Sequence, residues 1–152
     1  MADFTHAIDV GAEPEAVRRL IAAAGDAWWT TDAVIDERVG GVCAFRFPGT
    51  GFFAEVIVER NEPGLVQWRC TASDQSDAAL AASGGADPHE WVGTTIRFSI
   101  APANSGAHVR LAHLGLGASA EFYRTKDNIW GFYLESLKAL AETGQGKPYR
   151  AA

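Results

Sequence analysis

Residues 119–144 read SAEFYRTKDNIWGFYLESLKALAETG and carry the most regular pattern in the chain. Apolar side chains recur there at intervals of three and four residues, the spacing of one helix face: Phe122, Ile129, Trp130, Tyr133, Leu134, Leu137 and Leu140. Ser119 suits an N-cap, and Gly144, with Pro148 beyond it, suits the C-terminal end. The pattern predicts a helix of about 24 residues, roughly twice the usual length. Its wide apolar face must lie against an equally long surface.

The middle of the chain predicts that surface. Residues with the backbone preferences of tight turns interrupt it at residues 40–41, 48–51, 61–64 and 104–106. The runs between these turns have the usual length of strands. Short turns join antiparallel neighbours, so the sequence predicts an antiparallel sheet.

The N-terminal part predicts one strand and two short helices. Alternation from Phe4 to Val10 is typical of a half-buried strand. Pro14 suits the first residue of a helix, and apolar residues follow at helical spacing until Gly25. The pair Trp28-Trp29 then lies in a connector or a second short helix.

Alternation divides the expected strands into two faces. The charged and polar set is expected in water, forming cross-strand pairs: Arg46, Glu55, Glu59, Gln67, Arg69, Arg97, His108 and Arg110. The apolar set is expected on a concave face towards the long helix: Cys43, Phe45, Phe47, Val56, Val58, Val66, Trp68, Cys70, Val92, Ile96, Phe98, Ile100, Val109, Leu111 and His113. We therefore expect one α+β domain over residues 1–152, in which a curved antiparallel sheet of about seven strands wraps the C-terminal helix.

The facing surfaces carry more aromatic side chains than a small two-layer core usually needs. Aromatic walls with few polar groups are typical of small-molecule cavities. The candidate ligand-binding residues are Trp29, Phe45, Phe47, Val58, Trp68, Trp91, Phe98, Leu111, His113, Trp130 and Tyr133. A core filled by its own side chains remains the alternative.

His113 is the polar exception on the concave face. An imidazole can act there as hydrogen-bond donor, acceptor or proton carrier, although it can equally be a satisfied core residue. The candidates for acid–base chemistry are His113, Tyr123 and Tyr133. His6 shares the inner face of the first strand, but two histidines without a placed carboxylate make a weak metal site, and we expect no metal.

Other signatures of chemistry are absent from the sequence. It contains no GxSxG elbow, P-loop, GxGxxG or HExxH, so we expect no cofactor and favour binding over catalysis. Cys43 and Cys70 have no metal-binding spacing and are expected to be reduced and buried.

Charge and hydropathy limit the partners. The net charge is −6, and the 13 Lys and Arg residues are scattered, so nucleic acid is not an expected partner, because phosphates require clustered cations. No apolar run is long enough to span a bilayer, and the N-terminus has no secretion signal. We expect a cytoplasmic protein.

The polar stretch from Ala72 to Glu90 predicts a long loop, either a surface insertion or a lid.

Short sequence motifs match a known family at several places: Glu13-Pro14-Glu15-Ala16-Val17, Trp28-Trp29, Gly40-Gly41 before Phe45-Arg46-Phe47, Asn61-Glu62-Pro63 with Leu65-Val66-Gln67-Trp68, Trp91-Val92-Gly93-Thr94, Leu111-Ala112-His113, residues 130–138 and Glu142-Thr143-Gly144. With these motifs, the chain resembles the START/Bet v 1-like (SRPBCC) superfamily. Within it, the chain is similar to the group of activators of the heat-shock protein 90 ATPase. The resemblance covers nearly the whole chain and implies the helix-grip fold. It implies no shared catalytic residues.

Three functions fit these observations. The first is binding of a small hydrophobic or aromatic molecule, lipid-like or polyketide-like, between sheet and helix. The second is a cyclase or dehydrase in which His113 or a pocket tyrosine moves protons. The third is a protein-interaction module resembling the chaperone activators, with a chaperone as partner. A homodimer formed through an edge strand is a further possibility.

Overall fold

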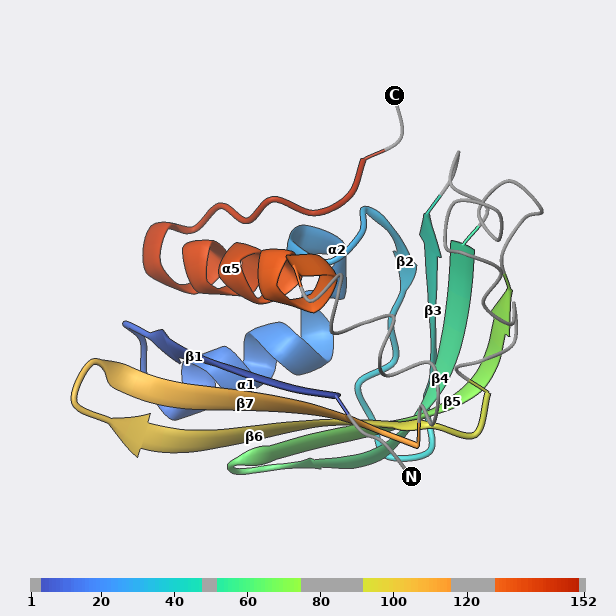
Figure 1. The fold of residues 1–152 in the computed structure, drawn as a ribbon, viewed down its shortest axis with the longest axis horizontal. Helices are drawn as coiled ribbons and strands as arrows, with labels where there is room; N and C mark the ends of the chain where they lie inside the picture. The colour runs from blue at the N-terminus through green and yellow to red at the C-terminus, as the bar shows by residue number, and fades with distance from the viewer. Residues whose placement is uncertain (1–3, 48–51, 75–91, 116–127, 151–152) are drawn as a thin grey trace.

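The computed structural model describes residues 4–47, 52–74, 92–115 and 128–150. A strongly curved sheet forms the base and one side of the molecule, and the helices lie within its curve (Figure 1). In chain order the elements are β1 (Phe4–Val10), α1 (Pro14–Ala23), α2 (Gly25–Trp28), β2 (Asp32–Val34), β3 (Val42–Phe47), β4 (Phe52–Glu62), β5 (Leu65–Asp74), β6 (Thr95–Ala103), β7 (Gly106–Leu114) and α5 (Asn128–Thr143).

The sheet has seven strands in the order β1-β7-β6-β5-β4-β3-β2, and the paired strands are antiparallel. Strand β1 pairs with β7, so the N-terminal strand forms one edge and β2 the other. The pairing of β4 with β5 shifts register between Glu55 and Val56 and again between Val58 and Arg60. Such irregularities bend a strand and increase its twist, which explains how the sheet curves around α5. The predicted seven-strand sheet is confirmed.

The two predicted faces of the sheet are confirmed for most of their members. Inward residues such as Phe45, Trp68, Phe98 and Leu111 are buried. The prediction for Val92 is wrong, because this side chain is 47% exposed. The reason is local: β6 begins only at Thr95, and Gly93 has a φ of +82° in the preceding turn, so strand alternation does not extend back to Val92.

The outer face of the sheet carries a ladder of polar contacts between neighbouring strands. Arg97 Nε donates to Gln67 Oε1 at 2.8 Å, and Gln67 Nε2 donates to Glu59 Oε1 at 3.1 Å. The same glutamate lies 3.7 Å from the Arg69 guanidinium. These are the predicted cross-strand pairs, each worth a few tenths of a kcal/mol to about 1 kcal/mol.

The two short helices close one end of the interior. Helix α1 begins at Pro14, whose missing N–H costs nothing in the first helical turn, and it buries Val17 and Ile21. The chain then turns into α2 at Gly25. A Cβ there would lie 2.8 Å from the Phe45 ring, so the approach of α2 to the sheet requires glycine. Trp28 ends α2, and Trp29 follows it.

Helix α5 buries Trp130, Leu134 and Leu137 against the concave face. It ends before Gly144, which has a φ of +85° and donates its N–H to Leu140 O at 2.9 Å, as predicted for a C′ glycine. The structure describes this helix from Asn128 onward, and the predicted segment from Ser119 to residue 127 lies outside the described residues. None of the helices in the described ranges is long and apolar enough to cross a membrane.

Polar contacts fasten the last turns of α5 to the end of β1. Glu142 Oε2 accepts a hydrogen bond from the Gly11 backbone N–H at 2.7 Å, and Lys138 Nζ donates to Asp9 O at 2.6 Å. Lys138 also forms an ion pair with Glu142 at 3.4 Å. We call these four residues the clasp.

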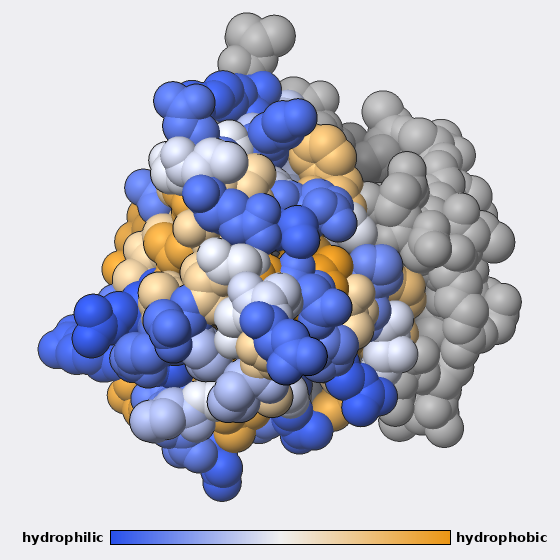
Figure 2. Space-filling model, turned by 90° about the vertical axis from the view of Figure 1, so that its left-hand side faces the viewer, coloured by the Kyte–Doolittle hydropathy of each residue, from blue (hydrophilic) through white to orange (hydrophobic). Residues whose placement is uncertain are grey.

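On the face of the molecule at the left of Figure 1, hydrophilic residues predominate, with small apolar areas between them (Figure 2).

Candidate functional site

Three tryptophans stack through the centre of the interior. The Trp29 ring lies nearly parallel to Trp28, with centroids 5.8 Å apart and 9° between the planes, and nearly parallel to Trp68, at 6.2 Å and 6°. Trp28 comes from α2 and Trp68 from β5. We call these residues the indole stack. It links the helical end of the interior to the concave face of the sheet.

Further rings surround the stack. Trp29 contacts Trp130 of α5 at a centroid distance of 5.3 Å and Phe45 of β3 at 4.3 Å. Trp68 meets Phe98 nearly edge-on at 5.2 Å. Trp29 therefore occupies the space between sheet and helix at this position, and aromatic surfaces form the walls on all these sides.

The two outer members of the stack differ in their hydrogen bonding. Trp28 is 0% exposed, and its indole N–H donates to Leu20 O at 3.0 Å. Trp68 is 1% exposed, yet its Nε1 is buried with no acceptor among the described residues. An unmade hydrogen bond of a buried donor costs about 1–3 kcal/mol, so the Trp68 N–H needs an explanation that the Trp28 N–H does not.

His113 lies in the same cross-sheet row as Trp68. Trp68 pairs with Ile96, and Ile96 pairs with His113, so the two side chains project from strands two spacings apart, about 10 Å. His113 is fully buried, and its ring meets Trp130 nearly edge-on at 6.0 Å. Its Nε2 forms a 2.9 Å hydrogen bond with Thr94 Oγ1. This pair can hold or move a proton at Nε2.

Cys70 adjoins that pair. Its backbone N–H donates to Thr94 O at 2.9 Å. Burial raises the pKa of its thiol to about 11, and a hydrogen bond with the Thr94 side chain opposes this only in part. Burial also raises the pKa of Cys43. Both thiols are free, as predicted, and neither is a nucleophile near neutral pH.

The His113 end of this row lies where several described strands begin or finish, whereas Trp68 lies within β5, opposite Val58 of β4. Strand β3 ends at Phe47, which pairs with the first residue of β4, and β7 ends at Leu114, which pairs with Thr95 at the start of β6. Helix α5 begins at the same end, beside the rising ends of β3 and β4 (Figure 1). The candidate site is the part of the concave face that Trp68, Thr94, His113 and Trp130 form here.

Solved structures share the fold of this chain. The Aha1 dimer from Colwellia psychrerythraea is 26% identical and aligns with a TM-score of 0.73 over 96% of this chain and 100% of that chain. An AHSA1-like protein from Aeromonas hydrophila is 16% identical, with a TM-score of 0.64 over 94% of each chain. DynU16, a protein in the dynemicin biosynthetic locus, is 15% identical with a TM-score of 0.70, over 95% of this chain and 48% of its own.

The chain has the START/Bet v 1-like helix-grip fold. The resemblance found in the sequence is thereby confirmed at the level of the fold, including the likeness to Aha1. No family model matches the sequence. No curated protein matches it either.

The helix-grip fold brings most of the predicted ligand-binding residues together inside the curve of the sheet. Those that are buried there are Trp29, Phe45, Phe47, Val58, Trp68, Phe98, Leu111, His113 and Trp130. Tyr133 is partly buried and contacts Phe47 at a centroid distance of 6.2 Å. Burial raises the pKa of its phenol, and the neighbouring Tyr149 adds to this effect, so the group stays neutral at physiological pH. Trp91, Tyr123 and most of the predicted loop or lid at 72–90 lie outside the described residues.

Sequence reasoning gave Thr94 no role in the site, and it named His6 without placing it. Thr94 precedes β6 and gave no periodic signal, yet it bonds His113. His6 lies beside α5, because a Cβ at Gly131 would meet its Nε2 at 3.5 Å. It pairs with Leu111 rather than with His113, and the described residues contain no cluster of three or more potential metal ligands.

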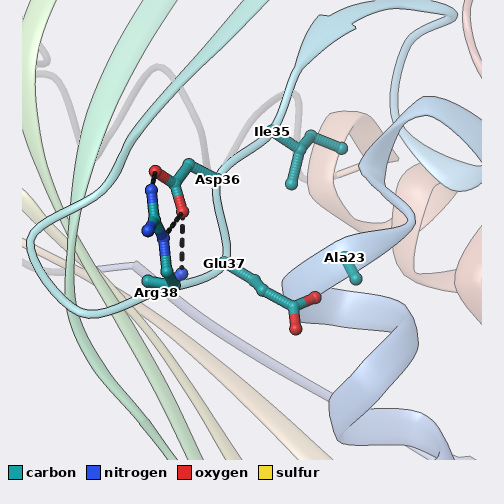
Figure 3. A pocket seen from close by; sticks show the side chains of 5 residues that line it. All are labelled: Ala23, Ile35, Asp36, Glu37 and Arg38. Carbon is teal, nitrogen blue, oxygen red and sulfur yellow. Dashed lines mark hydrogen bonds and ion pairs between the residues drawn. The ribbon is translucent and has the colours of Figure 1, made fainter.

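The described residues also line two hollows away from the helix-grip interior. One, of about 630 Å³, lies between the end of α1 and residues 35–38 (Figure 3). There Arg38 bonds both carboxylate oxygens of Asp36, at 3.0 and 2.9 Å, and holds its pKa at about 2. The other lies under the C-terminal segment, between Asp26 and Arg150. Neither hollow includes a predicted site residue.

Proposed function

We propose that the chain binds a small, largely apolar molecule between the concave face of the sheet and α5, at the end where Trp68 and His113 lie. The observation that carries this proposal is the buried indole N–H of Trp68, which has no acceptor among the described residues. A ligand acceptor there would recover the hydrogen bond that folding leaves unmade. The surrounding rings supply the apolar contact that a small-molecule site needs.

The site in its present conformation is filled at the level of Trp29, so binding requires room beside Trp68. Trp29 follows α2 and lies outside the strands of the sheet. Its connection to Thr30 leads directly into the edge strand β2. Admitting a ligand therefore means displacing this connector, where the Trp29 N–H donates to Gly25 O at 2.9 Å and the Trp29 carbonyl accepts the Tyr149 N–H at 2.8 Å.

Native mass spectrometry against a panel of lipids, polyketides and planar aromatic compounds tests the proposal. We expect wild-type protein to retain at least one compound class and Trp68→Phe to retain it less well. The matched control is Trp28→Phe, which makes the same change at the other tryptophan that stacks on Trp29 and should bind as wild type does. If no compound of the panel binds wild-type protein, the proposal is wrong.

Association with a second copy of the chain is a second candidate function. It is supported by the Aha1 dimer among the similar structures and by exposed apolar residues near the β2 edge: Val34 at 57%, Val39 at 66% and Val42 at 45%. Val42 alternates with the inward residue Cys43, so it lies on the outer face of the sheet. The same mass spectra report the dimer, and a monomer throughout the micromolar range would count against it.

A further inference from the structure

The hydrogen-bonding state of the buried polar groups limits what the ligand can be. Thr30 Oγ1 donates to Arg46 O at 2.7 Å, and Ser136 Oγ accepts the Lys147 N–H at 2.7 Å. Thr94 and His113 bond each other. Trp68 differs, since its Nε1 has no acceptor in the described part of the chain. An indole nitrogen donates and never accepts, so its complement on a ligand is a hydrogen-bond acceptor.

The charges of the interior give a second limit. Among the described residues, no Lys, Arg, Asp or Glu side chain is buried, and the buried polar ones are Thr30, Thr94, His113 and Ser136. An ionised ligand group placed among the rings would lose its hydration without gaining a counter-charge from any Lys, Arg, Asp or Glu side chain of the described residues. Burying an unpaired charge costs more than one hydrogen bond returns. The interior therefore disfavours carboxylates and phosphates next to Trp68.

The shape of the walls gives a third limit. The Trp29 ring, which must shift to admit a ligand, now lies nearly parallel to Trp68, with 6° between the planes, and Phe45 contacts Trp68 at a centroid distance of 5.7 Å. Flat rings pack on such surfaces by offset stacking. A planar skeleton fits better than a bulky branched one.

From these three limits, and resting on the proposed function, we infer that the ligand is a neutral, planar aromatic or polycyclic compound with a carbonyl oxygen, such as an aryl ketone, quinone or lactone. The carbonyl accepts the Trp68 N–H at the edge of the indole, and the ring system packs among the neighbouring aromatic side chains. Specificity for the acceptor follows because a compound without one leaves the buried N–H unpaired.

Three probes with one skeleton test this inference: acetylnaphthalene as the ketone, isopropylnaphthalene as its hydrocarbon counterpart and naphthoate as the anion. Their dissociation constants are measured by calorimetry at about pH 8, where an unperturbed imidazole is neutral, on wild type, Trp68→Phe and Trp28→Phe. The ratio of hydrocarbon to ketone dissociation constants cancels differences in how the variants pack. We expect this ratio to fall roughly 3- to 10-fold in Trp68→Phe, the effect of one hydrogen bond, and to stay unchanged in Trp28→Phe.

Indole resonances provide a readout that does not depend on variants. In a ¹H–¹⁵N spectrum, the ketone should shift the Trp68 Nε1–H further downfield than the hydrocarbon does, while the Trp28 signal responds equally to both. A ratio unchanged by Trp68→Phe, or equal shifts of the Trp68 signal, overturns the acceptor requirement. Naphthoate binding as tightly as the ketone overturns the requirement for neutrality. Failure of all three probes and of the wider panel overturns the proposed function as well.

Discussion

Trp28 and Trp68 both lie nearly parallel to Trp29 but differ in their hydrogen bonding. Both are buried, and both stack on the same ring. At Trp28 the neighbouring helix supplies an acceptor, Leu20 O, so the side chain is a satisfied part of the core. At Trp68 the sheet and the aromatic rings supply none among the described residues. Burial and ring contacts thus do not distinguish the two tryptophans, whereas the hydrogen bond of the indole N–H does.

Removing the Trp29 ring, which both outer indoles contact, should produce the largest loss of stability. Trp29→Ala deletes contacts to both outer indoles and to Trp130. We expect a loss of about 3–5 kcal/mol in the free energy of unfolding, the usual cost of truncating a buried aromatic residue. Added indole should restore part of the lost melting temperature by occupying the cavity.

The control for this variant is Phe132→Ala on α5, because Phe132 is 52% exposed. It should change stability by less than about 1 kcal/mol and show no response to indole. A Trp29→Ala protein as stable as wild type would mean that the ring does not support the two sides of the stack.

Matched substitutions on either side sharpen the comparison. Trp28→Phe and Trp68→Phe remove the same ring area, but only the first removes a hydrogen bond, and only the second removes an unsatisfied donor. We therefore expect Trp28→Phe to be the more destabilising of the two by about 1–2 kcal/mol. Urea unfolding curves with unchanged slope provide the measurement. Equal losses, or a greater loss for Trp68→Phe, would contradict the distinction between the two tryptophans.

The smallest effect is expected at the clasp, far from Trp68. The Gly11 N–H and, secondarily, Lys138 lower the pKa of the Glu142 carboxyl. A lowered folded-state pKa stabilises the protein above the unfolded pKa of glutamate, about 4.3. That contribution disappears as the pH falls through the lower folded-state value.

Glu142→Gln should therefore lower the melting temperature slightly at pH 7 and make it less sensitive to acid below about pH 5. Glu135→Gln provides the control, because Glu135 is exposed on the same helix. Ligand binding should be unaffected in both variants. An acid profile of Glu142→Gln that matches wild type would show that the clasp carboxylate does not contribute.

The fold could be predicted from the sequence because its signals are periodic. Alternation in the strands and the three- and four-residue spacing of Trp130, Leu134 and Leu137 reflect which side of each element meets water. Strand alternation failed to predict the exposure of Val92, because Gly93 forms a turn with positive φ and β6 begins only after it, at Thr95.

The distinction between Trp28 and Trp68 was beyond sequence reasoning for a different reason. Whether a buried N–H finds an acceptor depends on where α1 places Leu20 O relative to α2, and no residue pattern encodes that position. Thr94 was missed on the same ground, since its contact with His113 depends on the register of β6 and β7. Sequence periodicity thus finds the faces of elements, while the polar contacts of a site require three-dimensional placement.

The pairing of the first strand with β7 constrains the order in which the chain can fold during synthesis. Phe4 pairs with His113, and β1 has no other neighbour among the described strands. The residues of β1 must therefore wait for β7, more than a hundred residues later in the chain, before their backbone groups find these partners. Such long-range closure slows folding, and during that interval the apolar side of β1 is available to chaperones or to other nascent chains.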